Sequence, residues 1–147
     1  MDPTETVEEY YEALRRDEPL APYFAEREDV VKFGVSERLA GYEAVAEGLR
    51  EQTKTTEDWR VESDNLRVTH RDSVAWFTDD VVLAWTDSTG DRKSFDTRWS
   101  GVLERGDRSS GGTTDGDPGG TTDGGSGGIA DTRWRFVQMH VSAPHDR

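Results

Sequence analysis

The chain has 147 residues, a length that suits one domain with a core of its own. Its 31 acidic and 18 basic residues give a formal net charge of −13, and a surface of that charge repels the phosphates of nucleic acids and anionic membranes. The sequence contains no cysteine, which excludes disulfide bonds, thiolate metal sites and a cysteine nucleophile.

The acidic residues are spread along the whole chain, and the only lysines among the basic residues are Lys32, Lys54 and Lys93. This distribution favours adaptation to concentrated salt over a docking patch for one cationic partner, because salt screens the repulsion between like charges. We therefore expect a salt-adapted protein from a halophilic archaeon. Residues 1–15 lack the apolar core of a signal peptide and no stretch is apolar enough to span a membrane, so we expect a cytoplasmic protein.

Two amphipathic helices are predicted before most of the strands. The first begins at Asp2, where an N-cap carboxylate, a proline in the first turn and a glutamate three residues after the cap are typical of a helix start. It runs to about residue 17, and a proline-marked helical turn is expected over 19–24. The second helix is predicted to begin at Gly41 and to end among residues 53–56. The side chains that form the two apolar faces are Val7, Tyr10, Tyr11 and Leu14 in the first helix and Tyr42, Val45, Ala46 and Leu49 in the second.

The remaining elements are predicted as strands. A short strand over 29–35 separates the two helices. Longer strands rich in aromatic and β-branched residues follow over 59–69, 74–86, 93–104 and 133–142. Helices first and a meander of strands afterwards predict an α+β domain with the helices on one face of an antiparallel sheet.

A glycine-rich insert interrupts the last predicted hairpin at residues 106–132. It holds ten of the fifteen glycines, and the peptide GGTTDG occurs in it twice, at 111–116 and 119–124. Such a sequence buries too little apolar surface to offset the entropy of ordering it. We expect a flexible loop within a single domain of residues 1–147.

Four peptides resemble the SnoaL-like branch of the nuclear transport factor 2-like, or ketosteroid isomerase-like, superfamily. They are LAGYEAV at 39–45, VAWFTDD at 74–80, TRWSGVL at 97–103 and WRFVQMHVSAP at 134–144. The last two are also similar to the closing strands of the association domain of calcium/calmodulin-dependent protein kinase II. The resemblance implies a cone, in which a strongly curved antiparallel sheet wraps around the N-terminal helices as in cystatin-like folds. It also implies a pocket at the open end and a homodimer joined through the sheet.

The turn at 87–91 allows the register of the central hairpin to be predicted. With Thr89 and Gly90 at its tip, Asp79 faces Ser100 and becomes a diagonal neighbour of Arg98. Arg98 also matches an arginine that lines the pocket of the kinase association domain, so the resemblance identifies this side as the inner one. Asp80 would then lie outside, and a one-residue bulge would exchange the assignments.

Asp79 and Arg98 are the predicted catalytic residues. In an apolar pocket Asp79 could act as a general base, while Arg98 could hold an anionic ligand or a developing oxyanion. The alternative is that the two only neutralise one another as an ion pair. The side chains predicted to line the pocket, of which the aromatic ones could equally be plain core, are Tyr11, Phe24, Phe33, Phe77, Trp85, Ser100 and Met139.

Asp80 and His140 are weaker candidates for the site. Strict alternation in the last strand places His140 on the side of Trp134, Phe136 and Gln138. The resemblance instead points the opposite set inward and leaves His140 near a dimer contact. The sequence has no His-rich or His/Glu motif, so we expect no metal site.

We therefore expect a protein that binds a small apolar or amphipathic molecule, with no cofactor and no nucleic-acid or membrane partner. If it is an enzyme, acid–base chemistry without a cofactor is favoured: isomerisation, cyclisation or dehydration. A noncatalytic ligand-binding module and a homo-oligomeric assembly domain are the alternatives. A cone filled with side chains would favour assembly.

Overall fold

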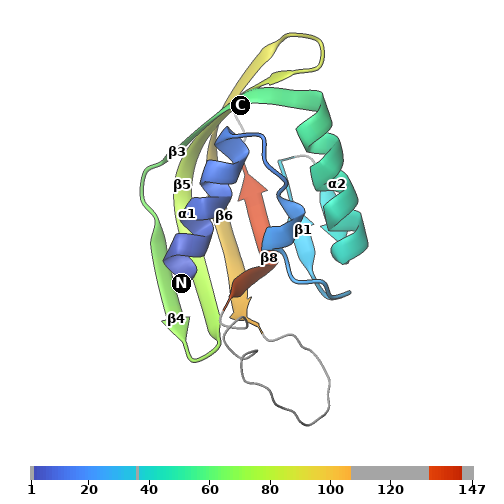
Figure 1. The fold of residues 1–147 in the computed structure, drawn as a ribbon. Coiled ribbons are helices and arrows are strands. Elements are labelled where there is room, and N and C mark those ends of the chain that lie inside the picture. The colour runs from blue at the N-terminus through green and yellow to red at the C-terminus, as the bar shows by residue number, and fades with distance from the viewer. Residues whose placement is uncertain (1, 36, 107–132, 144–147) are drawn as a thin grey trace.

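The computed structural model describes residues 2–35, 37–106 and 133–143 (Figure 1). Apart from Gly106, the insert predicted over 106–132 lies outside the described residues. The elements are α1 Pro3–Arg15, the 3₁₀ turn η1 Ala21–Tyr23, β1 Val31–Phe33, β2 Arg38–Ala40, α2 Tyr42–Thr55, β3 Thr56–Ser63, β4 Arg67–Arg71, β5 Val74–Asp87, β6 Arg92–Arg105 and β8 Trp134–Ser142.

Both predicted helices are confirmed. Asp2 caps α1, accepting a hydrogen bond from the amide of Glu5 at 2.9 Å, while the Glu5 carboxylate accepts from the amide of Asp2 at 3.1 Å. Gly41 precedes α2 with a φ of 90°, a left-handed conformation that glycine adopts without strain. Neither described helix has the length and apolar character that crossing a membrane would need.

Two details of the strands differ from the prediction. The stretch predicted as one strand over 59–69 is two strands, β3 and β4, and β2 was not predicted at all. The chain breaks between β3 and β4 because the amides of Asp64 and Asn65 donate to the Asp80 carbonyl and the Asp79 side chain of β5. Both amides are therefore hydrogen-bonded to β5, although neither residue belongs to a strand.

The described strands form one curved, unclosed sheet, in the order β2-β1-β8-β6-β5-β3, with β4 also paired to β5. The α+β cone predicted from the sequence is confirmed, although β1 and β8 are parallel rather than antiparallel. Figure 1 shows α1 lying across one face of this sheet and α2 beside β1, while the β5–β6 hairpin extends past the helices. Arg15 ties α1 to the sheet by donating from Nε and Nη2 to the Val61 carbonyl of β3, at 3.2 and 2.6 Å.

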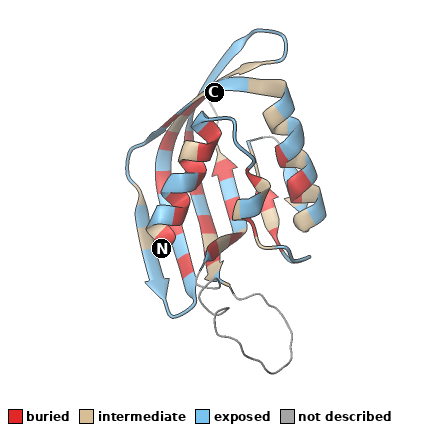
Figure 2. Cartoon of the chain, viewed as in Figure 1, coloured by how far each residue is buried: buried red, intermediate tan, exposed pale blue. Residues whose placement is uncertain are grey.

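The register of the β5–β6 hairpin differs by one residue from the prediction. Asp79 lies opposite Trp99, and Asp80 lies opposite Arg98. Buried and exposed residues alternate along both strands, as the bands in Figure 2 show, with Asp79 and Trp99 on the buried side. The prediction that Arg98 and Ser100 face inward is therefore wrong.

The turn between β5 and β6 explains this register. Asp87 and Asp91 close a five-residue loop through a backbone hydrogen bond of 2.9 Å, so the hairpin is centred on Thr89 and not between Thr89 and Gly90. The Asp87 carboxylate accepts hydrogen bonds from the amides of Thr89 and Asp91 at 2.9 and 3.0 Å. The hydrogen bond from the Thr89 hydroxyl, together with these two amide bonds, lowers the pKa of Asp87.

A β-bulge in β8 reconciles the two orientations expected for the last strand. Val102 lies opposite Gln138 and Leu103 opposite Phe136, so Val137 has no partner across the ladder. Trp134 and Phe136 before the bulge, and Met139 and Val141 after it, consequently all face the core, and His140 is exposed. Strict alternation correctly placed Trp134 and Phe136 on one side, but it holds only before the bulge. The family resemblance correctly pointed Met139 and Val141 inward, but it holds only after the bulge.

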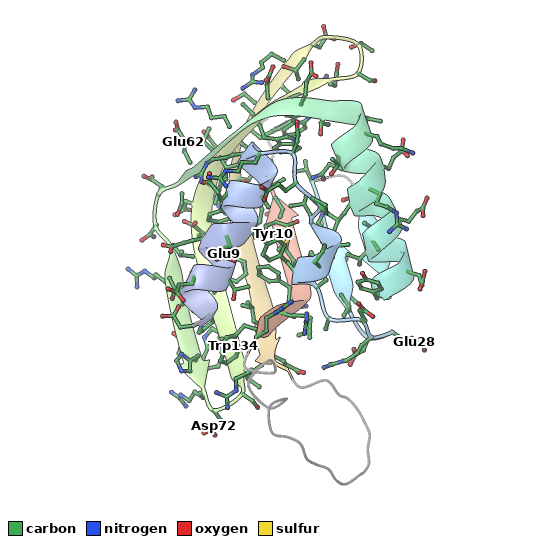
Figure 3. All side chains as sticks on the ribbon, in the orientation of Figure 1. Glu9, Tyr10, Glu28, Glu62, Asp72 and Trp134 are labelled. Atoms are coloured by element: carbon green, nitrogen blue, oxygen red, sulfur yellow. The ribbon has the colours of Figure 1, made fainter. Side chains whose placement is uncertain are left out.

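Gly101 lies opposite Met139 beside this bulge and must remain glycine. A Cβ atom at this position would come within 2.5 Å of the Gln138 carbonyl oxygen and 2.7 Å of the Phe77 ring. Tyr10 lies among the aromatic side chains of the core on this side of the sheet (Figure 3). Its ring makes edge contacts with the rings of Tyr23, Phe24, Trp99 and Phe136.

Candidate functional site

A cavity of about 410 Å³ lies between the helices and the buried face of the sheet. Its volume is typical of the pockets that hold small organic ligands. Its apolar wall is formed by Tyr10, Leu14, Trp59, Leu83, Trp85, Trp99 and Val141. Its polar groups are contributed by Lys32, Glu37, Glu51, Gln52, Thr55 and Thr56.

Trp59 and Trp85 present stacked indole rings at one end of this cavity. Their centroids are 4.7 Å apart and their planes are inclined by 23°, and the ring of Trp85 in turn stacks on Phe95. The Trp59 Nε1 donates to the Thr56 hydroxyl at 2.8 Å. Since this N–H already has a partner, the Trp59 ring can offer apolar surface to a ligand.

Trp99 contributes a third indole from β6. Its Nε1 donates to the Thr97 hydroxyl at 2.9 Å, and that hydroxyl donates to the Val81 carbonyl at 2.6 Å. Trp99 is buried and makes edge contacts with the rings of Tyr10 and Tyr11. The cavity therefore has a wall of fixed aromatic rings on three different strands.

Lys32 is the charged group buried in this cavity, and the sequence analysis missed it. Its side chain is only 6% exposed, and its Nζ lies 2.9 Å from Oε2 of Glu37. Lys32 faces inward because β1 pairs with β8 in a register that places it opposite Met139. Phe33, predicted to line the pocket, lies opposite His140 on the outer face, with ring centroids 5.5 Å apart.

The sequence carries only a weak signal for Lys32. Val30 and Lys32 alternate with Val31 and Phe33, so a period of two allows either pair to face inward. From the sequence one would choose the larger apolar pair, Val31 and Phe33, as the inward-facing one. The parallel pairing with β8 instead turns Lys32 inward, and β8 is more than a hundred residues away in the chain.

Glu37 reaches Lys32 across the turn between β1 and β2. Gly34 donates its amide to the Glu37 carbonyl at 2.9 Å, and a Cβ atom on Gly34 would come within 2.7 Å of the Glu37 carboxylate. The glycine thus leaves room for Glu37 to fold back towards Lys32. Glu37 is 41% exposed, so solvent reaches this carboxylate while the amine beneath it is covered.

Asp79 is buried, with 4% exposure, but it does not line this cavity. Its Oδ2 accepts hydrogen bonds from the hydroxyls of Tyr11 and Ser63, at 2.7 and 2.6 Å, and its Oδ1 accepts from the amide of Asn65 at 2.9 Å. The carboxylate therefore connects α1, the end of β3 and the following turn to β5. Arg98 lies on the opposite face, so the ion pair considered for these two residues does not form.

The other predicted site residues separate into three groups. Trp85 lines the cavity, whereas Tyr11, Phe24, Phe77 and Met139 are buried in the surrounding core. Asp80, Arg98, Ser100 and His140 lie on the outer face. These four border a second hollow of about 370 Å³, which Asp79 also reaches. Among residues 2–35, 37–106 and 133–143, no group of three or more His, Asp or Glu side chains could hold a metal ion.

Asp79→Asn is expected to lower the free energy of unfolding by about 2–3 kcal/mol, because an amide replaces a carboxylate that accepts three hydrogen bonds. Urea unfolding measures this change. Asp80→Asn is the matched control on the exposed face of the same strand and should stay within about 0.5 kcal/mol of the parent. Equal stability of the two variants would contradict the anchoring role of Asp79.

The protein is expected to lose stability above about pH 10, the ordinary pKa of tyrosine. Burial raises the pKa of Tyr10 and of Tyr11, and the hydrogen bond to Asp79 raises that of Tyr11 further. A pKa raised in the folded state gives stability that is complete below the unfolded pKa and decreases as the pH rises beyond it. The slope that each such tyrosine contributes reaches about 1.4 kcal/mol per pH unit well above pH 10, where the unfolded phenol is fully ionised.

Urea unfolding at pH 9 to 11 tests this expectation. Tyr11→Phe should remove about 0.7 kcal/mol per pH unit from the average slope over this range, because the unfolded phenol is about half ionised at pH 10. Tyr42→Phe is the comparison: burial raises the pKa of Tyr42 as well, but the ring is only partly buried, so this variant should change the slope less. An unchanged slope in Tyr11→Phe would mean that this phenol ionises as readily in the folded protein as in the unfolded one.

Comparison with known proteins supports the family suggested by this architecture. The sequence profile of the SnoaL-like domain matches residues 4–109, and no curated protein has a sequence that matches the chain significantly. A nuclear transport factor 2-like superfamily protein from Salmonella enterica serovar Typhimurium is similar in structure, with a TM-score of 0.71 and 17% identity over 97% of this chain and 89% of that chain.

Two further solved structures share the fold. A ketosteroid isomerase-like protein from Erwinia carotovora atroseptica has a TM-score of 0.67 and 14% identity, over 97% of this chain and 94% of that chain. A protein from Streptomyces avermitilis, named provisionally as a dehydratase of the NTF2-like family, has a TM-score of 0.72 and 14% identity over the same shares. These likenesses show the fold alone. Since the profile covers more than half of the sequence, the chain belongs to the SnoaL-like domain family.

Proposed function

We propose that this protein binds a small, flat, amphipathic molecule in the cavity between α1, α2 and the sheet. The observation that carries the proposal is the wall of three indole rings, Trp59, Trp85 and Trp99, together with a buried amine at Lys32. Pockets of this kind combine apolar walls with a few polar groups that orient the ligand. Covering about 200 Å² of apolar ligand surface would contribute about 5 kcal/mol before the costs of association are subtracted.

Acid–base catalysis without a cofactor is the second candidate function. The observation in its favour is the Lys32–Glu37 pair, which places a proton donor and a carboxylate 2.9 Å apart inside the cavity. Such a pair could serve an isomerisation, cyclisation or dehydration. Asp79 is a poorer base than the sequence suggested, because its oxygens already accept three hydrogen bonds and it lies off the cavity.

The homodimer expected from the resemblance is proposed to form through the outer face of the sheet. Trp76 and Val74 of β5 are large apolar side chains exposed there, at 42% and 37%. The same face carries Asp80, Arg98 and His140, so it is too polar for a solely hydrophobic assembly surface. With an open cavity on the other face, these features support ligand binding over a purely structural assembly role.

Filling the cavity is expected to weaken ligand binding. Gln52→Trp places a large side chain at a position of α2 that lines the cavity, and it should weaken the binding of 2-ethylnaphthalene at least tenfold. Arg50→Trp, on the exposed side of the same helix, is the matched control and should bind as the parent does. Equilibrium dialysis gives both affinities. Equal binding by the two variants would place the ligand elsewhere, and no binding by the parent would refute the proposal.

Trp76→Arg is expected to shift the protein from dimer to monomer, because it introduces a charge into the proposed contact. Analytical ultracentrifugation measures the mass in solution. Val35→Arg is the control, since Val35 is equally exposed at 41% but lies at the rim of the cavity. A parent protein that sediments as a monomer, or a Trp76→Arg variant that remains a dimer, would contradict the proposed interface.

A further inference from the structure

Resting on the proposed homodimer, we infer that Trp76 of each copy inserts into the outer hollow of the other copy, so that the second copy completes this site. The outer hollow is the one of about 370 Å³ that is bordered by Asp80, Arg98, Ser100 and His140. Trp76 and this hollow lie on the same face of the sheet, because Trp76 and Asp80 are four residues apart along β5. The partner is a second copy of the chain, and the group that enters the hollow is an indole ring.

Trp76 is a large side chain that the fold leaves in contact with solvent. It is 42% exposed, and the guanidinium of Arg71 on the neighbouring strand β4 lies over its ring, 6.0 Å from the centroid. Within the part of the chain that the structure describes, its indole N–H donates to no acceptor. The indoles of Trp59 and Trp99, by contrast, both donate to a hydroxyl group. A pocket that covers the Trp76 ring and accepts from its N–H would therefore gain apolar burial and a hydrogen bond together.

The lining of the outer hollow suits an indole. Asp80 lies opposite Arg98 in the ladder, yet their side chains form no ion pair or hydrogen bond among the described residues. A guanidinium stacks on the face of an aromatic ring, and a carboxylate accepts from an indole N–H. Apart from Trp99, the residues that line the hollow are polar, which makes it a poor site for an apolar small molecule. The amphipathic ring of Trp76 meets both kinds of group.

The charges on the outer face allow a second copy to dock there. Each chain has a formal net charge of −13, so two copies repel one another over most of their surface. Arg67 and Arg71 of β4 lie opposite Thr78 and Val74 of β5, and this pairing places both arginines on the outer face together with Arg98. Three guanidinium groups offset the carboxylates of this face, so a second copy meets less repulsion here than elsewhere.

Twofold symmetry makes the two insertions equivalent. In a symmetric dimer, if Trp76 of one copy enters the hollow of the other, the reverse insertion also occurs. The axis must then cross the sheet halfway between Trp76 and the hollow, at the level of Thr78 and Ser100, which lie opposite one another on β5 and β6. Both are small side chains, so the two sheets can approach closely at the axis.

Ser100→Trp tests the inference by filling the hollow with a side chain of the same copy. It should raise the dissociation constant of the dimer at least tenfold, measured by analytical ultracentrifugation of the full chain. Ser94→Trp is the matched control, because Ser94 is exposed on the same face of β6 but lies outside the hollow, roughly 20 Å along the strand. It should dimerise as the parent does. Circular dichroism and melting curves establish that both variants are folded.

A mixture of two variants tests insertion itself. Trp76→Ala lacks the indole and keeps the hollow, whereas Ser100→Trp keeps Trp76 and has the hollow filled. When the two are mixed, one Trp76 can enter one open hollow. The heterodimer should therefore form at least tenfold more tightly than either variant binds to itself, and native mass spectrometry distinguishes the three dimers by mass.

The absence of cysteine from the chain provides a second measurement if Ser100→Trp does not fold. Thr78→Cys introduces a single thiol beside the proposed axis, so a short bismaleimide should link two copies into a covalent dimer. Ser94→Cys carries its thiol far from the axis and should remain unlinked under the same conditions. Denaturing electrophoresis measures the linked fraction.

The inference is overturned if Ser100→Trp dimerises as tightly as the parent, if the mixture shows no preference for the heterodimer, or if Thr78→Cys is linked no more than Ser94→Cys. A parent that sediments as a monomer would refute the proposed interface as well. A dimer that Trp76→Arg dissociates but Ser100→Trp leaves intact would refute the insertion alone, which separates the two conclusions.

Discussion

The five-residue turn from Asp87 to Asp91 is the constraint that determines which side chains enter the cone. The Asp87 carboxylate accepts hydrogen bonds from two amides of its own turn, which centres the hairpin on Thr89. Strands β5 and β6 then stay in register from Thr86 to Val74. This loop therefore determines which residues pair along the whole β5–β6 ladder. A loop with one residue more or fewer would exchange the two faces of one strand relative to the other. The indole of Trp99 lines the cavity for this reason, and the guanidinium of Arg98 does not.

Two further irregularities place the remaining walls. The bulge at Val137 turns Met139 and Val141 towards the core after Trp134 and Phe136 have already faced it. The second half of β8 pairs in parallel with β1, and this pairing places Lys32 opposite Met139 and directs it inward. Without the extra residue, the same pairing would direct Lys32 towards solvent. The amine in the cavity therefore depends on a bulge more than a hundred residues away in sequence.

Local patterns in the sequence were sufficient for the helices and for the general architecture, but not for the site. The cap at Asp2, the glycine before α2 and the aromatic strands are local signals, and the structure bears them out. The family resemblance supplied the cone and correctly left His140 outside. Whether Arg98 or Trp99 shares the inner face with Asp79, and whether Lys32 or Phe33 faces inward, depends on register, which is a property of paired strands. A sequence period of two fits both answers equally well. One residue in the turn at 87–91 decides the first question, and the bulge at Val137 decides the second.

The buried polar groups of this protein can be sorted by counting their hydrogen-bond partners. Asp79 accepts three hydrogen bonds from three different segments, so its partners are part of the fold and little capacity is left for a ligand. Lys32 has three donors and a bond to Glu37, an acceptor that is itself 41% exposed on a short turn. A buried carboxylate with all its partners stabilises one conformation, whereas a buried amine that has one acceptor among the described residues can gain from an acceptor that enters the cavity. This difference, rather than the identity of the residues, is why the candidate site centres on β1 and not on the Asp79 and Arg98 pair that the sequence suggested.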